Sequence, residues 1–108
     1  MITTQTIESM KHHDEWGGFG YLGERENVRD AVKSGERPVE DLQRVADVDE
    51  LVAAYANKNG ITFGRLFRWA NSRPGRHFAD CMFGWGDSLD RAWQRAQEWG
   101  VTPPLTRP

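Results

Sequence analysis

Five basic side chains in the middle of the chain form the group of residues best suited to bind a ligand. The segment between Glu50 and Asp80 contains no acidic residue. Such a local concentration of positive charge attracts phosphate groups even when the whole molecule is slightly acidic. In contact with a nucleic acid, Arg65 or Arg68 would pair with guanine edges, and Arg73, Arg76 and Lys58 would meet phosphates. The five residues of this basic window are Lys58, Arg65, Arg68, Arg73 and Arg76.

The charge of the chain is divided unevenly between its halves, although the net charge is only −2. Residues 1–50 carry twelve acidic and six basic residues, whereas residues 51–108 carry four acidic and eight basic ones. Two interpretations stay open at this point. Either the basic half faces phosphate groups, or the two halves attract each other within one domain. In the second case, an acidic segment docked over residues 65–76 would block nucleic-acid binding.

Other reactive side chains lack the spacing that metal binding or catalysis requires. The four potential ligands His12 to Glu15 are consecutive, so on a helix they point in different directions. His77 and Cys81 share a helical face, but a nucleophile and base there would lack an orienting third group and an oxyanion site. We therefore predict no metal site, no cofactor and no enzymatic activity.

A second motif, from Gly18 to Gly23, spells G-x-G-x-x-G ahead of an expected helix. The dinucleotide-binding fingerprint needs a buried strand before it, and Lys11 to Trp16 is too polar for that role. The glycines either let neighbouring aromatic side chains fold back on the core or present them to a protein partner. The second alternative predicts a partner-binding surface formed by Trp16, Phe19, Tyr21, Phe63 and Phe67.

Size and composition fit one soluble globular domain. A chain of 108 residues with 38% hydrophobic and 28% charged residues can bury a single core. The single Cys81 cannot form an internal disulfide. The N-terminus lacks the apolar core of a signal peptide. No apolar run approaches the ~20 residues of a membrane span. We therefore expect a cytoplasmic protein without membrane contact.

Apolar side chains recur at spacings of three and four residues, which predicts an all-α bundle of about five to six short helices. The predicted single domain covers residues 1–102, and residues 103–108 form an extended tail. A glycine and aromatic loop is expected over residues 16–23, and a helix is expected over residues 87–99.

Residues 77–85 fit a helix better than a strand. Asp47 is predicted to cap a new helix, and Pro74-Gly75 to form a turn.

The clearest unit is the helix-turn-helix-like segment over residues 47–72. Small Ala56 lets two helices approach, Gly60 permits a left-handed turn, and Ile61 fills the angle between them. Val52 to Asn71 resembles the twenty-residue pattern of bacterial and phage helix-turn-helix DNA-binding domains. The resemblance implies that the positions facing DNA are Thr62, Phe63, Gly64, Phe67, Arg68 and Asn71.

Two functions follow from these patterns. The first is a small DNA-binding protein, of the kind that serves as a phage or prophage regulator, which contacts duplex DNA and would be expected to act as a homodimer. Its predicted contacts are Lys58, Thr62, Arg65, Arg68, Asn71, Arg73 and Arg76. The alternative is a non-enzymatic module that binds and modulates or inhibits a larger partner protein through the aromatic surface. Exposed aromatic side chains would favour the module, and buried ones beside exposed arginines would favour DNA binding.

Overall fold

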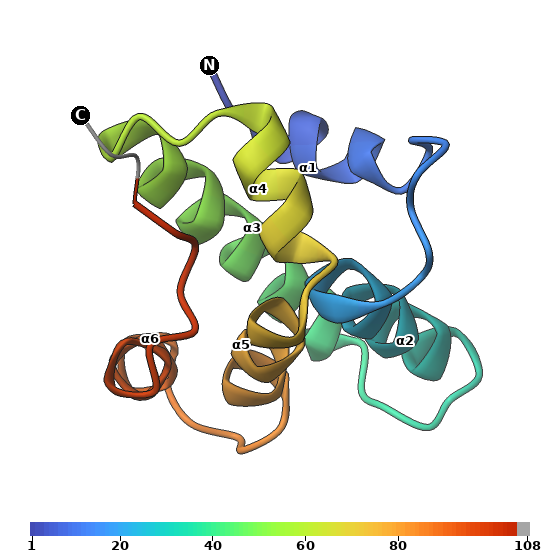
Figure 1. Cartoon of the computed structure of the whole chain (residues 1–108). Coiled ribbons are helices and arrows are strands. Elements are labelled where there is room, and N and C mark those ends of the chain that lie inside the picture. Colours follow the sequence, from blue (N-terminus) through green and yellow to red (C-terminus); the bar gives the residue numbers. More distant parts are fainter. Residues whose placement is uncertain (106–108) are drawn as a thin grey trace.

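Residues 1–105, the part of the chain that the computed structural model describes, fold into six α-helices and contain no strand. The helices pack around one apolar core, in agreement with the predicted all-α fold (Figure 1). In chain order they are α1 (Thr4–Met10), α2 (Gly20–Lys33), α3 (Glu40–Lys58), α4 (Phe63–Ala70), α5 (Arg73–Phe83) and α6 (Leu89–Glu98).

Aromatic side chains join the helices at the centre of the fold. α5 packs mainly against α2, α6 and α4, and it lies between α2 and α6 in Figure 1. The ring centroid of Phe78 lies 5.5 Å from that of Tyr21 and 5.0 Å from that of Trp69, in edge-to-face arrangements. Such contacts add to the free energy gained by burying the rings. They hold α2, α4 and α5 together, and α4 and α5 carry most of the basic window.

The start of α2 differs from the predicted loop. The loop prediction for residues 16–23 is wrong from Gly20 onward, because α2 begins there. Gly20 has a φ of +71°, and a Cβ at this position would lie 2.3 Å from the carbonyl oxygen of Ala70. A Cβ at Gly23 would lie 2.3 Å from the carbonyl oxygen of Gly18. The glycines therefore allow close backbone packing at the helix start, a role that glycine also plays outside nucleotide-binding loops.

The predicted helix start at Asp47 is wrong, because α3 continues through it as a single helix of 19 residues. The carboxylate of Asp47 accepts a hydrogen bond from Gln43 Nε2, one turn earlier in the same helix (2.9 Å). No glycine or proline interrupts residues 40–58, and buried valines continue from Val45 to Val52. The apolar stripe thus continues across the expected break, and packing of that stripe outweighs the local cap signal.

The turn after α3 forms at the predicted residues. Gly60 has a φ of +64°, and the Ile61 N–H donates to the carbonyl oxygen of Ala56 (2.8 Å). The Thr62 hydroxyl then caps α4 by accepting from the Arg65 N–H (3.3 Å). α4 packs mainly on α5 and α2. The action of α3 and α4 as a DNA-binding helix-turn-helix therefore stays a prediction.

Pro74 and Gly75 belong to the first turn of α5, so the predicted turn at these residues is wrong. The Ser72 hydroxyl caps the helix by accepting from the Gly75 N–H (3.3 Å). Proline is favoured in a first turn because its missing N–H would have no partner there. Residues 77–85 are helical as predicted as far as Phe83, where α5 ends.

The last helix and the segment after it close the core. α6 lies within the predicted range 87–99, with Ser88 as its cap. The Trp69 indole N–H donates to the carbonyl oxygen of Val101 (2.9 Å), and both Val101 and Pro103 are buried. The tail predicted from residue 103 therefore packs on the core at its first residue. Its last residues, 106–108, lie outside the described part of the chain.

Candidate nucleic-acid interface

A groove with two arginines on its wall lies between α4, the start of α5 and the segment after α6. It has a volume of about 510 Å³, and none of its described lining residues is acidic. Arg65 and Arg68 line it from α4, and Arg73 stands in the chain between two further lining residues, Ser72 and Pro74. We call Arg65, Arg68, Arg73 and this cavity the arginine groove. The remaining lining residues are Trp69, Gly100, Thr102 and Pro104.

The charges of the arginine groove are not neutralised by neighbouring side chains. Within residues 1–105, Arg65, Arg68 and Arg73 form no ion pair. Arg68 and Arg73 are exposed, and Arg65 is half-buried against the groove. Positive charges without nearby acidic partners raise the local potential, and a concave wall concentrates it. The groove is therefore suited to bind an anionic ligand.

The other two basic residues of the window have different surroundings. The guanidinium of Arg76 lies 3.9 Å from a carboxylate oxygen of Glu24 and 5.7 Å from the ring centroid of Phe19. Lys58 is exposed in the last turn of α3, on the other side of the Gly60 turn from α4. The described acidic half thus contacts the basic window through an ion pair at Arg76 and leaves the arginine groove open.

Thr62 and Asn71 support α4 through their side chains. The oxygen of Thr62 caps the helix start, and the Asn71 amide donates to the carbonyl oxygen of Phe67 at the helix end (3.0 Å). The Thr62 oxygen therefore satisfies a free N–H at the start of α4, whereas the Asn71 amide adds a second hydrogen bond to a carbonyl that already accepts the Asn71 backbone N–H. Both side chains thus bind the backbone at the ends of α4. The arginines are therefore the principal candidates for contacts with DNA.

The five aromatic residues of the alternative surface do not share one exposed face. Tyr21 and Phe67 are 1% and 7% exposed, and Trp16 packs partly against the core. Phe19 and Phe63 are 43% and 38% exposed. The prediction that Tyr21 and Phe67 contact a partner is wrong for the folded chain, because the apolar core already contains their rings.

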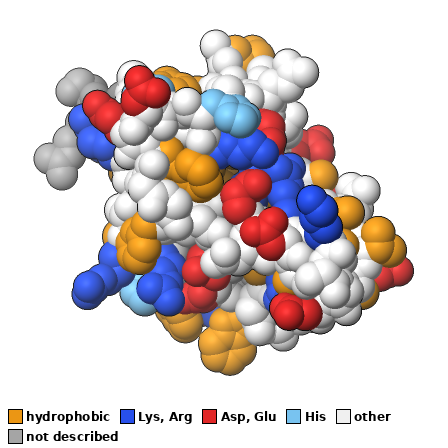
Figure 2. Space-filling model, turned by 90° about the vertical axis from the view of Figure 1, so that its right-hand side faces the viewer, with side chains coloured by type: hydrophobic (Ala, Val, Ile, Leu, Met, Phe, Trp, Pro, Cys, Tyr) orange, Lys and Arg blue, Asp and Glu red, His pale blue; other side chains and the backbone are white. Residues whose placement is uncertain are grey.

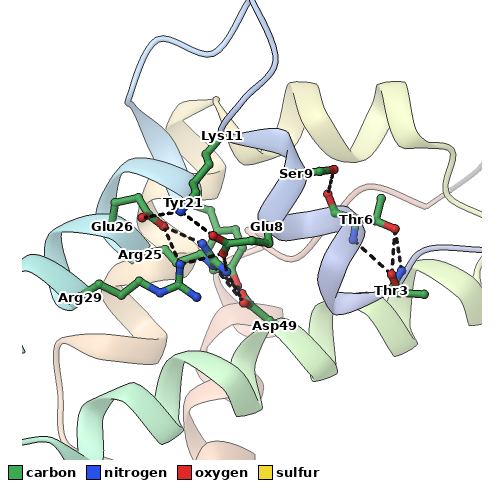
Figure 3. Close-up of polar contacts among 10 residues, drawn as sticks. All are labelled: Thr3, Thr6, Glu8, Ser9, Lys11, Tyr21, Arg25, Glu26, Arg29 and Asp49. Atoms are coloured by element: carbon green, nitrogen blue, oxygen red, sulfur yellow. Dashed lines mark hydrogen bonds and ion pairs between the residues drawn. The ribbon is translucent and has the colours of Figure 1, made fainter.

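A cluster of charged side chains, which is not among the predicted sites, joins α1, α2 and α3 (Figure 3). Arg25 of α2 is 1% exposed and Asp49 of α3 is 3% exposed. Arg25 Nε lies 2.9 and 3.0 Å from the two carboxylate oxygens of Asp49, and Arg25 Nη2 donates to Asp49 Oδ2 (2.6 Å). The Tyr21 hydroxyl donates to the same carboxylate. Both buried charges are thus paired and hydrogen-bonded.

Further side chains surround Arg25 at the outer end of this cluster. Glu8 of α1 accepts from Arg25 Nη2 (2.6 Å) and from Arg29 Nη1 (2.7 Å). Glu26 accepts from Arg25 Nη1 (2.6 Å), and Lys11 forms ion pairs with Glu8 and Glu26. The side chains converge from three helices in Figure 3. We call these residues, with Tyr21 and Asp49, the ion-pair cluster.

The pKa values of the cluster follow from these contacts. Burial alone would raise the pKa of Glu8, but hydrogen bonds from Lys11, Arg25 and Arg29 lower it from 4.5 to about 2. Burial and the neighbouring Asp49 carboxylate raise the pKa of Tyr21 well above its usual value. Burial opposes the charge of Arg25, but its bonds to Asp49 raise the pKa above the usual range. The charged forms of Arg25 and Glu8 and the neutral phenol of Tyr21 are therefore the stable ones.

One sequence signal points to this cluster in retrospect. Arg25 lies four residues after Tyr21 and three before Val28, on the buried stripe of α2. Asp49 lies at the same spacings between Val45 and Val52, on the buried stripe of α3. A charged residue on an apolar stripe needs a partner of opposite charge, because an unpaired buried charge is strongly unfavourable. Opposite charges on two such stripes therefore predict a buried pair.

The two remaining candidates for chemistry, His77 and Cys81, differ in burial. His77 is exposed and lies 3.7 Å from an Asp80 carboxylate oxygen, whereas Cys81 is buried. Burial raises the pKa of the Cys81 thiol, which disfavours the nucleophilic thiolate. No group of three or more His, Cys, Asp or Glu side chains among residues 1–105 is placed to hold a metal ion.

The surface around α2 differs in charge pattern from the arginine groove. Figure 2 shows the side of the molecule that lies to the right in Figure 1, and acidic and basic side chains lie next to each other there. Arg29 of α2 forms an ion pair with Glu26, and Arg37, after the end of α2, forms one with Asp41. Mixed charges cancel over a short distance in salt solution. This side is therefore less suited to nucleic acid than the arginine groove.

Comparison of the chain with protein-family models, with curated proteins and with solved structures finds no match. None of the described helices is long and apolar enough to cross a membrane.

Proposed function

We propose that this protein binds duplex DNA through the arginine groove. The observation that carries the proposal is the position of Arg65 and Arg68 on the wall of a groove whose described lining contains no acidic residue. Arg73 adds a third positive charge beside it, which is exposed. DNA carries one phosphate charge per ~1.7 Å of helix axis, so a cluster of uncompensated arginines gains affinity by releasing its counterions.

The start of α5 supports the same proposal. Its first turn carries Arg73 and adjoins the groove at Ser72 and Pro74. The N-terminal end of a helix carries a partial positive charge, which favours a phosphate placed near it. The groove therefore combines side-chain charge with the dipole of an 11-residue helix. Arg68, the more exposed of the two α4 arginines, is the side chain best placed to continue from phosphate contacts to a base edge.

The burial of Tyr21 and Phe67 favours DNA binding over partner binding through the predicted aromatic surface. Tyr21 and Phe67 are in the core, whereas Arg68 and Arg73 are exposed. A protein-binding module of the predicted kind needs a contiguous exposed aromatic patch. Of the five residues of that predicted surface, only Phe19 and Phe63 are exposed.

Fluorescence anisotropy with a labelled random-sequence duplex tests the proposal. The protein is titrated at about 50 mM and about 200 mM salt, and we expect micromolar binding that weakens steeply with salt. Replacing Arg65, Arg68 and Arg73 together by alanine should flatten the dependence of log K on log salt by about one unit per arginine.

Lys33→Ala is the matched control, because it removes an exposed positive charge from the last turn of α2. It should leave the salt dependence unchanged. The proposal is rejected if the wild-type protein shows no binding at low salt, or if the triple variant and the control bind DNA equally well.

A further inference from the structure

We infer that the outer side of α6, together with the loop before it, binds a second copy of this protein. Two exposed tryptophans contact each other on this side. Trp85 and Trp99 are 58% and 51% exposed, and their ring centroids lie 6.5 Å apart in an edge-to-face arrangement. Tryptophan is enriched at the centres of protein interfaces, where it contributes much of the binding free energy. We call Trp85, Trp99, Arg91, Arg95 and Glu98 the tryptophan surface.

α6 presents this surface at the edge of the fold. The helix packs mainly on α5, and Figure 1 shows it at the periphery of the bundle. Ala92 and Ala96 are fully buried on its inner side, whereas Arg91 and Glu98 are exposed on its outer side. The outer side of α6 is therefore open to a partner that approaches along the helix.

The centre of the surface is already ordered and neutral. The guanidinium of Arg95 lies 4.8 Å from the ring centroid of Trp85 and forms an ion pair with Asp87. Covering a paired charge is less unfavourable than covering an isolated one, because its partner moves with it into the interface. The cation over the ring also limits the freedom of both side chains before binding. Association would thus require little rearrangement of the surface.

The order of charges along α6 identifies a second copy as the partner. Arg91 and Glu98 are seven residues apart, which is two helical turns or about 10.5 Å along the same side of the helix. In a two-fold symmetric, antiparallel contact of two α6 helices, Arg91 of each protomer faces Glu98 of the other. Such an isologous contact forms the same pair twice. The tryptophans of both protomers then lie beside the paired charges.

This inference stands independently of DNA binding, because none of its residues lines the arginine groove. The two surfaces nevertheless adjoin, since Gly100 of the groove follows Trp99 directly. A dimer would therefore carry two arginine grooves. Two linked sites bind one ligand more tightly than either does alone when the geometry lets both engage.

Light scattering after size-exclusion chromatography, with loads from about 5 µM to about 500 µM, tests the inference. The wild-type mass should rise from one chain to two. Arg91→Glu and Glu98→Arg should each raise the dissociation constant about tenfold, because each places like charges opposite each other twice. The double variant R91E/E98R should restore wild-type association, because the reversed pair attracts again. Trp99→Ala should weaken association about tenfold or more.

Lys33→Glu reverses an exposed charge on α2 and should leave the dimer unchanged. Circular dichroism melting checks that every variant is folded, so that loss of association is not loss of structure. A wild-type mass of one chain over the whole range overturns the inference. A folded double variant that associates no better than either single variant also overturns it.

Discussion

Arg25 and Asp49 form a buried ion pair in which Nε and Nη2 of the arginine both donate to the carboxylate. The two residues are 24 positions apart and come from different helices. Because both are almost fully buried, each neutralises a charge that would otherwise be highly unfavourable in the core. The pair therefore determines how α2 and α3 can pack.

Removing one partner of this pair should destabilise the fold strongly. Asp49→Asn removes the buried carboxylate partner of Arg25 and leaves only Glu8 and Glu26 at its outer end. We expect the free energy of unfolding to fall by about 3 kcal/mol, the low end for a broken buried pair, because these two carboxylates still compensate part of the charge. Urea denaturation, monitored by circular dichroism, measures this free energy of unfolding. The matched control is Glu50→Gln, which changes an exposed carboxylate next in the chain and should alter stability by less than about 0.5 kcal/mol. Equal stability of the two variants would contradict a structural role of the pair.

Glu8 should make stability depend on pH in the acidic range. Its pKa is lowered in the folded chain from 4.5 to about 2. A lowered carboxyl pKa stabilises the folded state above the unfolded pKa, and this stabilisation is lost as the pH falls from about 4.5 towards 2. Glu8→Gln should therefore be less stable than wild type at pH 7, by about 1 kcal/mol because the carboxylate is partly exposed.

Urea denaturation at several pH values measures the free energy of unfolding of wild type and of Glu8→Gln. The difference between the two free energies should shrink progressively below pH 4.5. Glu15→Gln is the control, since Glu15 is exposed and lies outside the ion-pair cluster. A stability difference for Glu8→Gln that stays constant from about pH 7 to about pH 2.5 would show that its charge is not responsible.

Two glycines with positive φ should differ in their tolerance of alanine. Gly35 has a φ of +83°, and a Cβ there would meet no atom within 4 Å, so Gly35→Ala should cost only the strain of the left-handed conformation, about 1 kcal/mol. Gly20 has a φ of +71°, but a Cβ there would lie 2.3 Å from the Ala70 carbonyl oxygen. Gly20→Ala should therefore cost at least about 2 kcal/mol more. Thermal and urea unfolding of both variants provide the comparison, and equal losses would exclude a close approach of α2 to residue 70.

The surroundings of two exposed arginines predict unequal contributions to DNA binding. Arg76 already lies beside Glu24 and over the ring of Phe19, whereas Arg68 forms no ion pair within residues 1–105. Arg68→Ala should weaken duplex binding several-fold and reduce the salt dependence by about one charge. Arg76→Ala should have a smaller effect, because part of its charge is compensated by Glu24. Anisotropy titrations of the two variants test this order, and a larger loss for Arg76→Ala would place the DNA on the Glu24 side of α5.

Several local features of the fold could be predicted from the sequence because their causes lie within a few residues. The turn at Gly60 and the helix within residues 87–99 depend on neighbouring backbone groups and on apolar spacing. The concentration of arginine after Glu50 is equally visible in the chain itself. These signals were sufficient for the all-α fold class and for the choice of the basic window.

Local signals failed where distant packing opposed them. Asp47 looks like a cap, but the valines before and after it bury one continuous side of α3. The glycines before Glu24 look like a loop, but α2 already begins at Gly20, which lies against the backbone of Ala70. In both places a contact made across the fold outweighs a preference set by neighbouring residues.

The sequence by itself determined the helical pattern, the turn at Gly60 and the concentration of basic residues after Glu50. Only the tertiary structure decided which charges are available. It buries Arg25 against Asp49, pairs Arg76 with Glu24, and leaves Arg65 and Arg68 on a groove completed by the segment after α6. Helix propensity and capping act over about one turn, whereas the exposure of a charge depends on which distant residues pack beside it.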